Sequence, residues 1–207
     1  LDFSTRAARR RNCAEELRLN QALAPGVYLG VVPLARDESG NARLEAEGRV
    51  LEWLVKMRRL PADRMLDRLI RQRAVRESEI EELARLLADF YRQSPAVDIR
   101  GEDYWMEYRR MLEANQAVLS DPAYALPSAR VRAVHEKIFS WLEQAQPVFA
   151  GRVAAGRIVD GHGDLRPEHI CLEPWPVIFD RLEFNRQFRL VDAADELASL
   201  AMECDRL

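Results

Sequence analysis

The chain has 207 residues, of which 48% are hydrophobic and 31% are charged, and its formal net charge at pH 7 is −3. This composition is typical of a folded globular protein long enough to bury a substantial core, and it excludes a largely disordered chain. The weakly acidic charge gives no electrostatic basis for general binding to nucleic acid or to a membrane surface, so we expect neither partner.

The three cysteines are odd in number and far apart in the chain, at Cys13, Cys171 and Cys204. This pattern predicts reduced thiols in a cytoplasmic protein rather than a disulfide framework. No apolar run approaches the ~18 residues of a membrane span, and no signal peptide is visible. Because the chain starts at Leu1 without a methionine and ends within a helical pattern, we expect it to be part of a longer protein.

The first part of the chain predicts a small lobe made of one helix and antiparallel strands. Ser4 or Thr5 is the expected N-cap of a helix that runs to about Leu23. β-Branched and aromatic residues then predict strands, with a turn rich in Asp, Ser and Gly between the first two. The expected strands are 27–34, 43–47 and 50–57.

From residue 61 onward, apolar residues recur at helical spacing. A capping box at Ser78 and Glu81 predicts the start of one helix, and Ser128 is the expected N-cap of another, whose pattern changes after Pro147. We expect three buried helical stripes: Ile80, Leu83, Leu87, Phe90 and Tyr91; Tyr104, Trp105, Tyr108, Met111 and Leu112; and Val131, Val134, Ile138, Trp141, Leu142 and Ala145. His135, beside the third stripe, is expected to be structural, and a final helix is expected over 192–207.

One stretch near the C-terminus holds an unusual arrangement of polar residues. His162 and His169 are two of the three histidines, and Asp164 lies between them in a glycine-flanked loop. Asp180 follows a short apolar run. Strands are expected at 169–172 and 177–179. This placement brings the two carboxylates to one edge of a hairpin, where they can share a cation or divide the work of base and metal ligand.

The run His162-Gly163-Asp164-Leu165, with Asp180 at a strand end, resembles the catalytic and metal-binding loops of the aminoglycoside phosphotransferase family, a branch of the protein-kinase-like fold. Residues 1–5 and 13–20 are similar to the family's helix that carries the glutamate paired with the ATP lysine. Residues 28–33 and 55–61 are similar to its next strands and hinge. Residues 195–198 are similar to the helix whose aspartate braces the catalytic loop. These segments are especially similar to the branch often fused to a P-loop ATPase domain. The resemblance implies an α+β, protein-kinase-like two-lobe fold, with a partial N-terminal lobe over 1–60 that lacks its first strands and a mainly helical C-terminal lobe over 61–207.

The resemblance also implies an ATP-dependent phosphotransferase that acts on a hydroxyl of a small molecule, with magnesium as the metal. Asp164 would orient or deprotonate the acceptor hydroxyl, and Asp180 would hold the metal that bridges the nucleotide phosphates. Glu16, rather than Glu15, is the expected partner of the ATP lysine. His162 belongs to the catalytic loop, where it takes part in the reaction or stabilises the backbone. The residues expected around the nucleotide are Lys56, Met57, Arg58 and Leu60.

Two departures from the family pattern keep alternatives open. His169 stands where the family has asparagine, and imidazole suits manganese, zinc or iron better than magnesium. His169 is thus an expected metal ligand, with manganese as an alternative metal, unless Glu168 takes over that role. The ATP lysine should precede the first helix, and neither Lys56 nor Lys137 occupies its position. A catalytically impaired, pseudokinase-like nucleotide-binding or regulatory domain is therefore a second interpretation.

A third interpretation is a metallohydrolase with a mixed nitrogen–oxygen site. Its ligands would be His162, Asp164, His169 and Asp180. Glu183 is either a further ligand or a solvated acid. The acceptor is expected to bind along residues 94–157. The residues there that suit a cationic or sugar-like molecule are Asp98, Glu102, Asp103, Tyr104 and Trp105.

Overall fold

The computed structural model describes residues 3–207 of the chain. Leu1 and Asp2, which the family resemblance included with the first helix, lie outside the described residues. The chain forms two compact units, one comprising Leu1–Pro95 with Val159–Leu207 and the other Ala96–Ile158, and each is described by itself. The lobe boundary expected at residue 60 falls inside the larger unit, and the division into two lobes stays a prediction.

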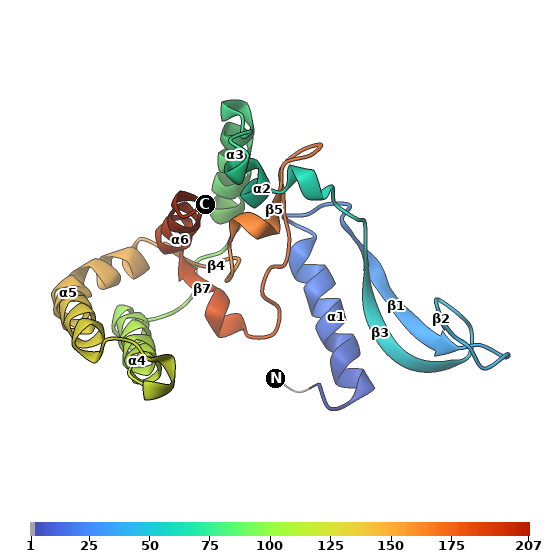
Figure 1. Ribbon diagram of the computed structural model, residues 1–207, viewed down its shortest axis with the longest axis horizontal. Helices are drawn as coiled ribbons and strands as arrows, with labels where there is room; N and C mark the ends of the chain where they lie inside the picture. The colour runs from blue at the N-terminus through green and yellow to red at the C-terminus, as the bar shows by residue number, and fades with distance from the viewer. Residues whose placement is uncertain (1–2) are drawn as a thin grey trace. The chain divides into compact units, whose positions relative to one another are not determined.

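The larger unit begins with a helix and an antiparallel sheet, as predicted (Figure 1). Helix α1 (Arg6–Asn20) is capped by Thr5, whose side chain accepts a hydrogen bond from the Ala8 amide at 3.1 Å. Three strands follow and form a sheet in the order β2-β1-β3: β1 (Tyr28–Arg36), β2 (Ala42–Leu44) and β3 (Arg49–Met57). An Arg9–Glu52 ion pair of 2.6 Å fastens α1 to β3.

The rest of the larger unit is helical apart from two small strand pairs. Its helices are η1 (Ala62–Arg64), α2 (Leu66–Arg71), α3 (Glu77–Gln93), η3 (Pro167–His169), η4 (Arg186–Arg189) and α6 (Ala193–Asp205). Its strands are β4 (Ile158–Asp160), whose first residue belongs to the smaller unit, β5 (Ile170–Cys171), β6 (Val177–Ile178) and β7 (Leu190–Asp192). β4 pairs with β7, and β5 pairs with β6 in antiparallel register. Asp164 lies in the loop that follows β4, and Asp180 lies two residues beyond the end of β6.

The predicted capping box of α3 is wrong in its position. The helix begins at Glu77 with Arg76 as N-cap, and the buried carboxylate of Glu79 accepts the Arg76 backbone amide at 2.9 Å. Glu79 also binds the Arg76 and Arg64 side chains, and these hydrogen bonds lower its pKa to about 2. The helix therefore starts at Glu77, before the predicted cap at Ser78. Ile80, expected in the buried stripe, is 43% exposed.

The smaller unit is a pair of helices, α4 (Gly101–Leu119) and α5 (Ser128–Ala154), joined through η2 (Pro122–Tyr124). They pack closely at Gly101, where a Cβ atom would lie 2.7 Å from the Ala150 Cα. The Trp105 indole donates to the Leu142 carbonyl at 2.9 Å. The helix pair is therefore held by a buried aromatic core.

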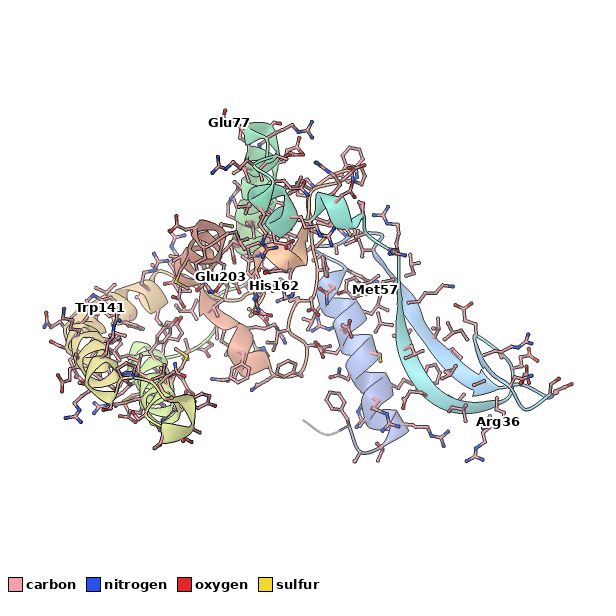
Figure 2. The ribbon with its side chains drawn as sticks, viewed as in Figure 1. Arg36, Met57, Glu77, Trp141, His162 and Glu203 are labelled. Carbon is pink, nitrogen blue, oxygen red and sulfur yellow. The ribbon has the colours of Figure 1, made fainter. Side chains whose placement is uncertain are left out.

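The third predicted stripe is partly wrong. Leu142 and Ala145 are buried with His135, whereas Val134, Ile138 and Trp141 are exposed, Trp141 by 62% (Figure 2). Two outward-facing members of the other stripes, Ile80 and Met111, are also exposed. Pro127 rather than Ser128 is the N-cap, and α5 continues through Pro147 to Ala154. Packing of the flanking turns on α4 offsets the one backbone hydrogen bond that a proline removes.

No helix in residues 3–207 is long and apolar enough to cross a membrane. The expected cytoplasmic location stays a prediction.

Candidate active site

The loop that follows β4 presents Asp164 to solvent. Gly161 donates its amide to the Arg189 carbonyl at 2.7 Å, which ties the loop to the end of η4. Gly163 has a φ of +88°, and a Cβ atom there would lie 2.9 Å from the Arg189 Cγ. Both the backbone conformation and the space require glycine at this position. The Asp164 side chain beyond it is 46% exposed.

His162 is buried within this loop, with 1% of its surface exposed. Its Nε2 donates to the Phe179 carbonyl at 2.9 Å, and its Nδ1 accepts the Asp164 amide at 3.3 Å. Burial lowers the pKa of His162 to about 3, so the ring is neutral at physiological pH. A neutral ring with both nitrogens occupied links the Asp164 loop to the strand that precedes Asp180. A direct part for His162 in the reaction stays a prediction.

Glu196 on α6 is a buried site residue for which the sequence predicted the element but not the residue. Its carboxylate accepts the Gly163 amide at 2.6 Å, the His162 amide at 3.1 Å and the Tyr91 hydroxyl at 2.6 Å. The resemblance implied an aspartate from 195–198 as the brace, but Asp195 is exposed and Glu196 makes these bonds. Three donors on one buried carboxylate fix the loop in a single conformation.

Asp180 follows β6 with its side chain 58% exposed. Its backbone is left-handed, with a φ of +64°. The Asp180 amide donates to the Tyr28 hydroxyl at 3.1 Å, and the next amide, that of Arg181, donates to the Asn20 side chain at 2.9 Å. The end of α1 and the start of β1 therefore both contact this segment.

His169 connects the two aspartates. Its Nδ1 lies 2.9 Å from the Asp164 backbone oxygen, and its Nε2 lies 3.3 Å from the Asp180 carboxylate. The ring also lies against that of His162, with centroids 6.0 Å apart. The structure thus brings Asp164, His169 and Asp180 together. The Glu168 carboxylate lies instead 3.7 Å from the Arg166 guanidinium.

Acidic side chains gather between α1 and the Asp180 segment. Burial, and then the charges of Glu183 and Asp180, raise the pKa of Glu16 to about 7. The Glu16 carboxylate makes no hydrogen bond or ion pair within residues 3–207, whereas Glu15 pairs with Arg18 at 2.6 Å on the surface. Glu183 accepts the Asn12 side-chain amide at 3.0 Å. Glu16 therefore faces the site and lacks a cation.

The expected nucleotide contacts lie at the end of β3, where Met57 is labelled in Figure 2. Lys56 forms an ion pair of 2.6 Å with Glu45 and is half-exposed. The Arg58 amide donates to the Val27 carbonyl at 2.8 Å, so it is occupied, and Leu60 packs partly against the core. Within the described residues, the amide of Leu60 has no hydrogen-bond partner and remains available.

The side chains present fit a nucleotide-bound magnesium ion better than a metal held by protein alone. Within residues 3–207, no group of three or more His, Cys, Asp and Glu side chains is arranged to hold a metal ion. The four-ligand hydrolase site fails because both nitrogens of His162 are already bonded. Magnesium usually takes only one or two carboxylates and completes its shell with phosphate oxygens and water. The exposed carboxylate of Asp180 matches that requirement.

A charged network behind the site was missed in the sequence. Asp160 at the end of β4 accepts Arg181 at 2.8 Å and Arg189 at 2.7 Å, and Arg186 joins it at 3.2 Å. Arg181 and Arg189 are buried. The Arg181 side chain also donates to the Gly161 carbonyl at 2.8 Å. No local sequence signal distinguishes these arginines from the many on the surface.

The amino-acid sequence is similar to a known family and to proteins of mycobacteria. A sequence model of the phosphotransferase enzyme family matches residues 2–194. Uncharacterized proteins of Mycobacterium bovis and of two Mycobacterium tuberculosis strains are 32% identical to the chain over 211 residues. The alignments cover 100% of this chain but only 40% of each relative. No solved structure matches the chain. The chain belongs to the phosphotransferase enzyme family.

Proposed function

We propose that this chain is the catalytic part of an ATP-dependent phosphotransferase that acts on a hydroxyl group of a small molecule. The observation that carries the proposal is the arrangement of two exposed carboxylates, Asp164 and Asp180, on either side of His169. Phosphoryl transfer needs positioned charges more than covalent chemistry by the protein. Two aspartates held by separate loops can serve the acceptor and the nucleotide separately.

Asp164 would accept the hydrogen bond of the acceptor hydroxyl and take its proton as the hydroxyl oxygen bonds to the γ-phosphorus of ATP and ADP leaves with the bridging oxygen. The Asp164 side chain is 46% exposed, and the His169 Nδ1 lies 3.8 Å from its carboxylate. The side chain is exposed because His162 and Glu196 fix the loop through backbone amides rather than through the Asp164 side chain. Asp180, with His169 beside it, is the place for magnesium or manganese, which supplies charge neutralisation on the phosphates when bound. Glu16 is positioned to pair with a cation near those phosphates.

A hollow of about 430 Å³ adjoins Asp164 and is the proposed place for the acceptor. It is lined by Asp164 and Arg166 on one side and by the α6 residues Ser199 and Glu203 on the other. These groups suit a polar, hydroxyl-bearing molecule. Tyr104 and Trp105, which the sequence suggested as acceptor contacts, are buried in the core of the smaller unit.

The decisive experiment is phosphotransfer and ATP turnover by the full-length protein with magnesium or manganese. Asp164→Ala is expected to lower turnover by about 10³-fold while nucleotide binding persists, because only the proton acceptor is removed. Asp180→Ala is expected to abolish metal-dependent nucleotide binding. Asp63→Ala, an exposed aspartate in η1, is the matched control and should behave as wild type. Undiminished turnover in Asp164→Ala would refute the proposal.

A second candidate is a nucleotide-binding regulatory domain without turnover. It is favoured by His169, which stands in the place of the family's asparagine beside Asp180. Calorimetric titration separates the two candidates. Tight binding of nucleotide with metal, combined with no turnover in any acceptor mixture, would support the regulatory role.

A further inference from the structure

The backbone at Asp180 is held in a conformation that L-amino acids seldom adopt. Its φ of +64° lies in the left-handed region, which is costly for a residue with a side chain, although aspartate tolerates it better than most. Such a residue persists only where its surroundings fix it. The relevant question is which groups hold Asp180 there.

Two buried side chains accept the successive amides of this segment. The Tyr28 hydroxyl accepts the Asp180 amide at 3.1 Å, and the Asn20 side-chain oxygen accepts the Arg181 amide at 2.9 Å. Tyr28 is 6% exposed and Asn20 is 0% exposed. Asn20 is itself oriented, because its side-chain NH₂ donates to the Glu16 carbonyl at 2.9 Å. Asn20 is therefore held both by its own helix and by the Asp180 segment.

The opposite side of the segment is fixed as well. The Arg181 side chain donates to the Gly161 carbonyl at 2.8 Å and to Asp160 at 2.8 Å. The Phe179 carbonyl accepts a hydrogen bond from the His162 Nε2 atom at 2.9 Å. With bonds on both sides of it, Asp180 has one backbone orientation, and that orientation directs its carboxylate toward His169 and solvent.

We propose that Tyr28 and Asn20 are positioning residues for Asp180, and that they set the affinity of the site for a nucleotide-bound divalent cation. The inference rests on the proposed role of Asp180 as the metal ligand. Neither residue touches the reacting groups. They act through the backbone of Asp180, in the way that groups around a metal ligand orient it.

The test measures binding of Mn²⁺·ADP and of metal-free ADP to the full-length protein by calorimetry. Tyr28→Phe removes only the hydroxyl and keeps the buried ring, so the fold should persist. We expect Mn²⁺·ADP to bind about tenfold more weakly, with metal-free ADP unchanged. Asn20→Leu, which removes the acceptor of the Arg181 amide, should act in the same direction. Tyr108→Phe in the smaller unit is the matched control.

Amide hydrogen exchange gives a second readout. Exchange at Asp180 and Arg181 should accelerate in Tyr28→Phe and Asn20→Leu, respectively, without a change across α3. If Asp180→Ala abolishes binding of Mn²⁺·ADP but Tyr28→Phe and Asn20→Leu bind it as tightly as wild type, the positioning role is overturned. If Asp180→Ala also binds Mn²⁺·ADP normally, the proposed metal role itself fails. Equal weakening of metal-bound and metal-free ADP would likewise overturn a role directed at the metal. If Asn20→Leu does not fold, Tyr28→Phe decides.

Discussion

The Nε2 atom of His169 lies 3.3 Å from the carboxylate of Asp180, while its Nδ1 atom lies 2.9 Å from the backbone oxygen of Asp164. A carbonyl oxygen only accepts hydrogen bonds, so Nδ1 carries the proton in that contact. In a neutral ring, Nε2 then directs a lone pair toward Asp180, and a cation at the proposed metal site would relieve that repulsion. His169 therefore lies beside Asp180, the proposed metal ligand.

The first prediction concerns metal preference. Asparagine in place of His169 offers an oxygen ligand, which magnesium prefers, and removes an imidazole, which suits manganese better. We expect His169→Asn to lower the ratio of kcat/KM with Mn²⁺ to that with Mg²⁺ by about tenfold. His135→Asn, at a buried histidine of the smaller unit, is the control. An unchanged ratio would place His169 outside the metal site.

The second prediction concerns the brace of the catalytic loop. In the wild type, the His162 and Gly163 amides and the Tyr91 hydroxyl all donate to the Glu196 carboxylate. Glu196→Gln replaces one carboxylate oxygen with an NH₂ group, which cannot accept, so at least one of these buried donors loses its partner. The free energy of unfolding should fall by about 3 kcal/mol, and turnover should fall with it. Asp205→Asn, at the exposed end of the same helix, should cost no more than about 0.5 kcal/mol. Urea titration measures both, and equal effects would contradict the assignment of the brace.

The third prediction concerns the arginines behind the site. Asp160→Asn leaves Arg181 and Arg189 buried without their shared negative charge. Removing one partner of a buried ion pair typically costs about 3–5 kcal/mol, and we expect a loss in that range. Asp103→Asn, which breaks an exposed pair with Arg100, should leave the free energy of unfolding nearly unchanged. A small effect at Asp160 would mean that carbonyl groups alone satisfy the two arginines.

The fourth prediction concerns the pH dependence of stability. The pKa of Glu16 is about 7 in the folded protein, above its ordinary value of 4.5, because of burial and the nearby Glu183 and Asp180. Between these two pH values the folded state holds more protons than the unfolded state, so the contribution of Glu16 to stability declines as pH rises. Glutamine does not titrate, so residue 16 makes no such pH-dependent contribution to the stability of Glu16→Gln.

The difference in unfolding free energy between Glu16→Gln and wild type should therefore be near zero at pH 4.5, grow through the window up to pH 7 and stay constant above it. His162, whose low pKa makes stability rise with pH, contributes equally to both proteins and cancels. Glu15→Gln is the control, since hydrogen bonding to Arg18 lowers the pKa of Glu15. Urea titrations at several pH values measure the difference, and a constant offset would contradict the prediction.

Most helices and strands could be predicted because their signals are local. The strand composition of β1 and β3 and the turn between them lie within a few dozen residues. Helical spacing shows which residues share a face, but not whether another element covers that face. Val134, Ile138 and Trp141 obey the spacing of α5 and are exposed, because the buried face of α5 is rotated toward Leu142.

The candidate site divides in the same way. Asp164 and Asp180 could be predicted because each sits in a recognisable loop next to a short strand. Tyr28 and Asn20 could not, since a tyrosine in a strand and an asparagine at a helix end are common features. Their role arises from bonds to residues far along the chain, and only the assembled fold reveals such bonds.

Those long connections have a consequence for how the protein folds. Tyr28 bonds a residue 152 positions away, Asn20 one 161 positions away and Asn12 one 171 positions away. Closing such large loops is slow compared with forming a helix or a hairpin. A growing chain on the ribosome can form α1 and the sheet early, but the segment beyond β6 can dock only after residues 179–183 have been made. The site is therefore completed long after α1 and the sheet have been synthesised, and chains truncated before residue 180 cannot assemble it.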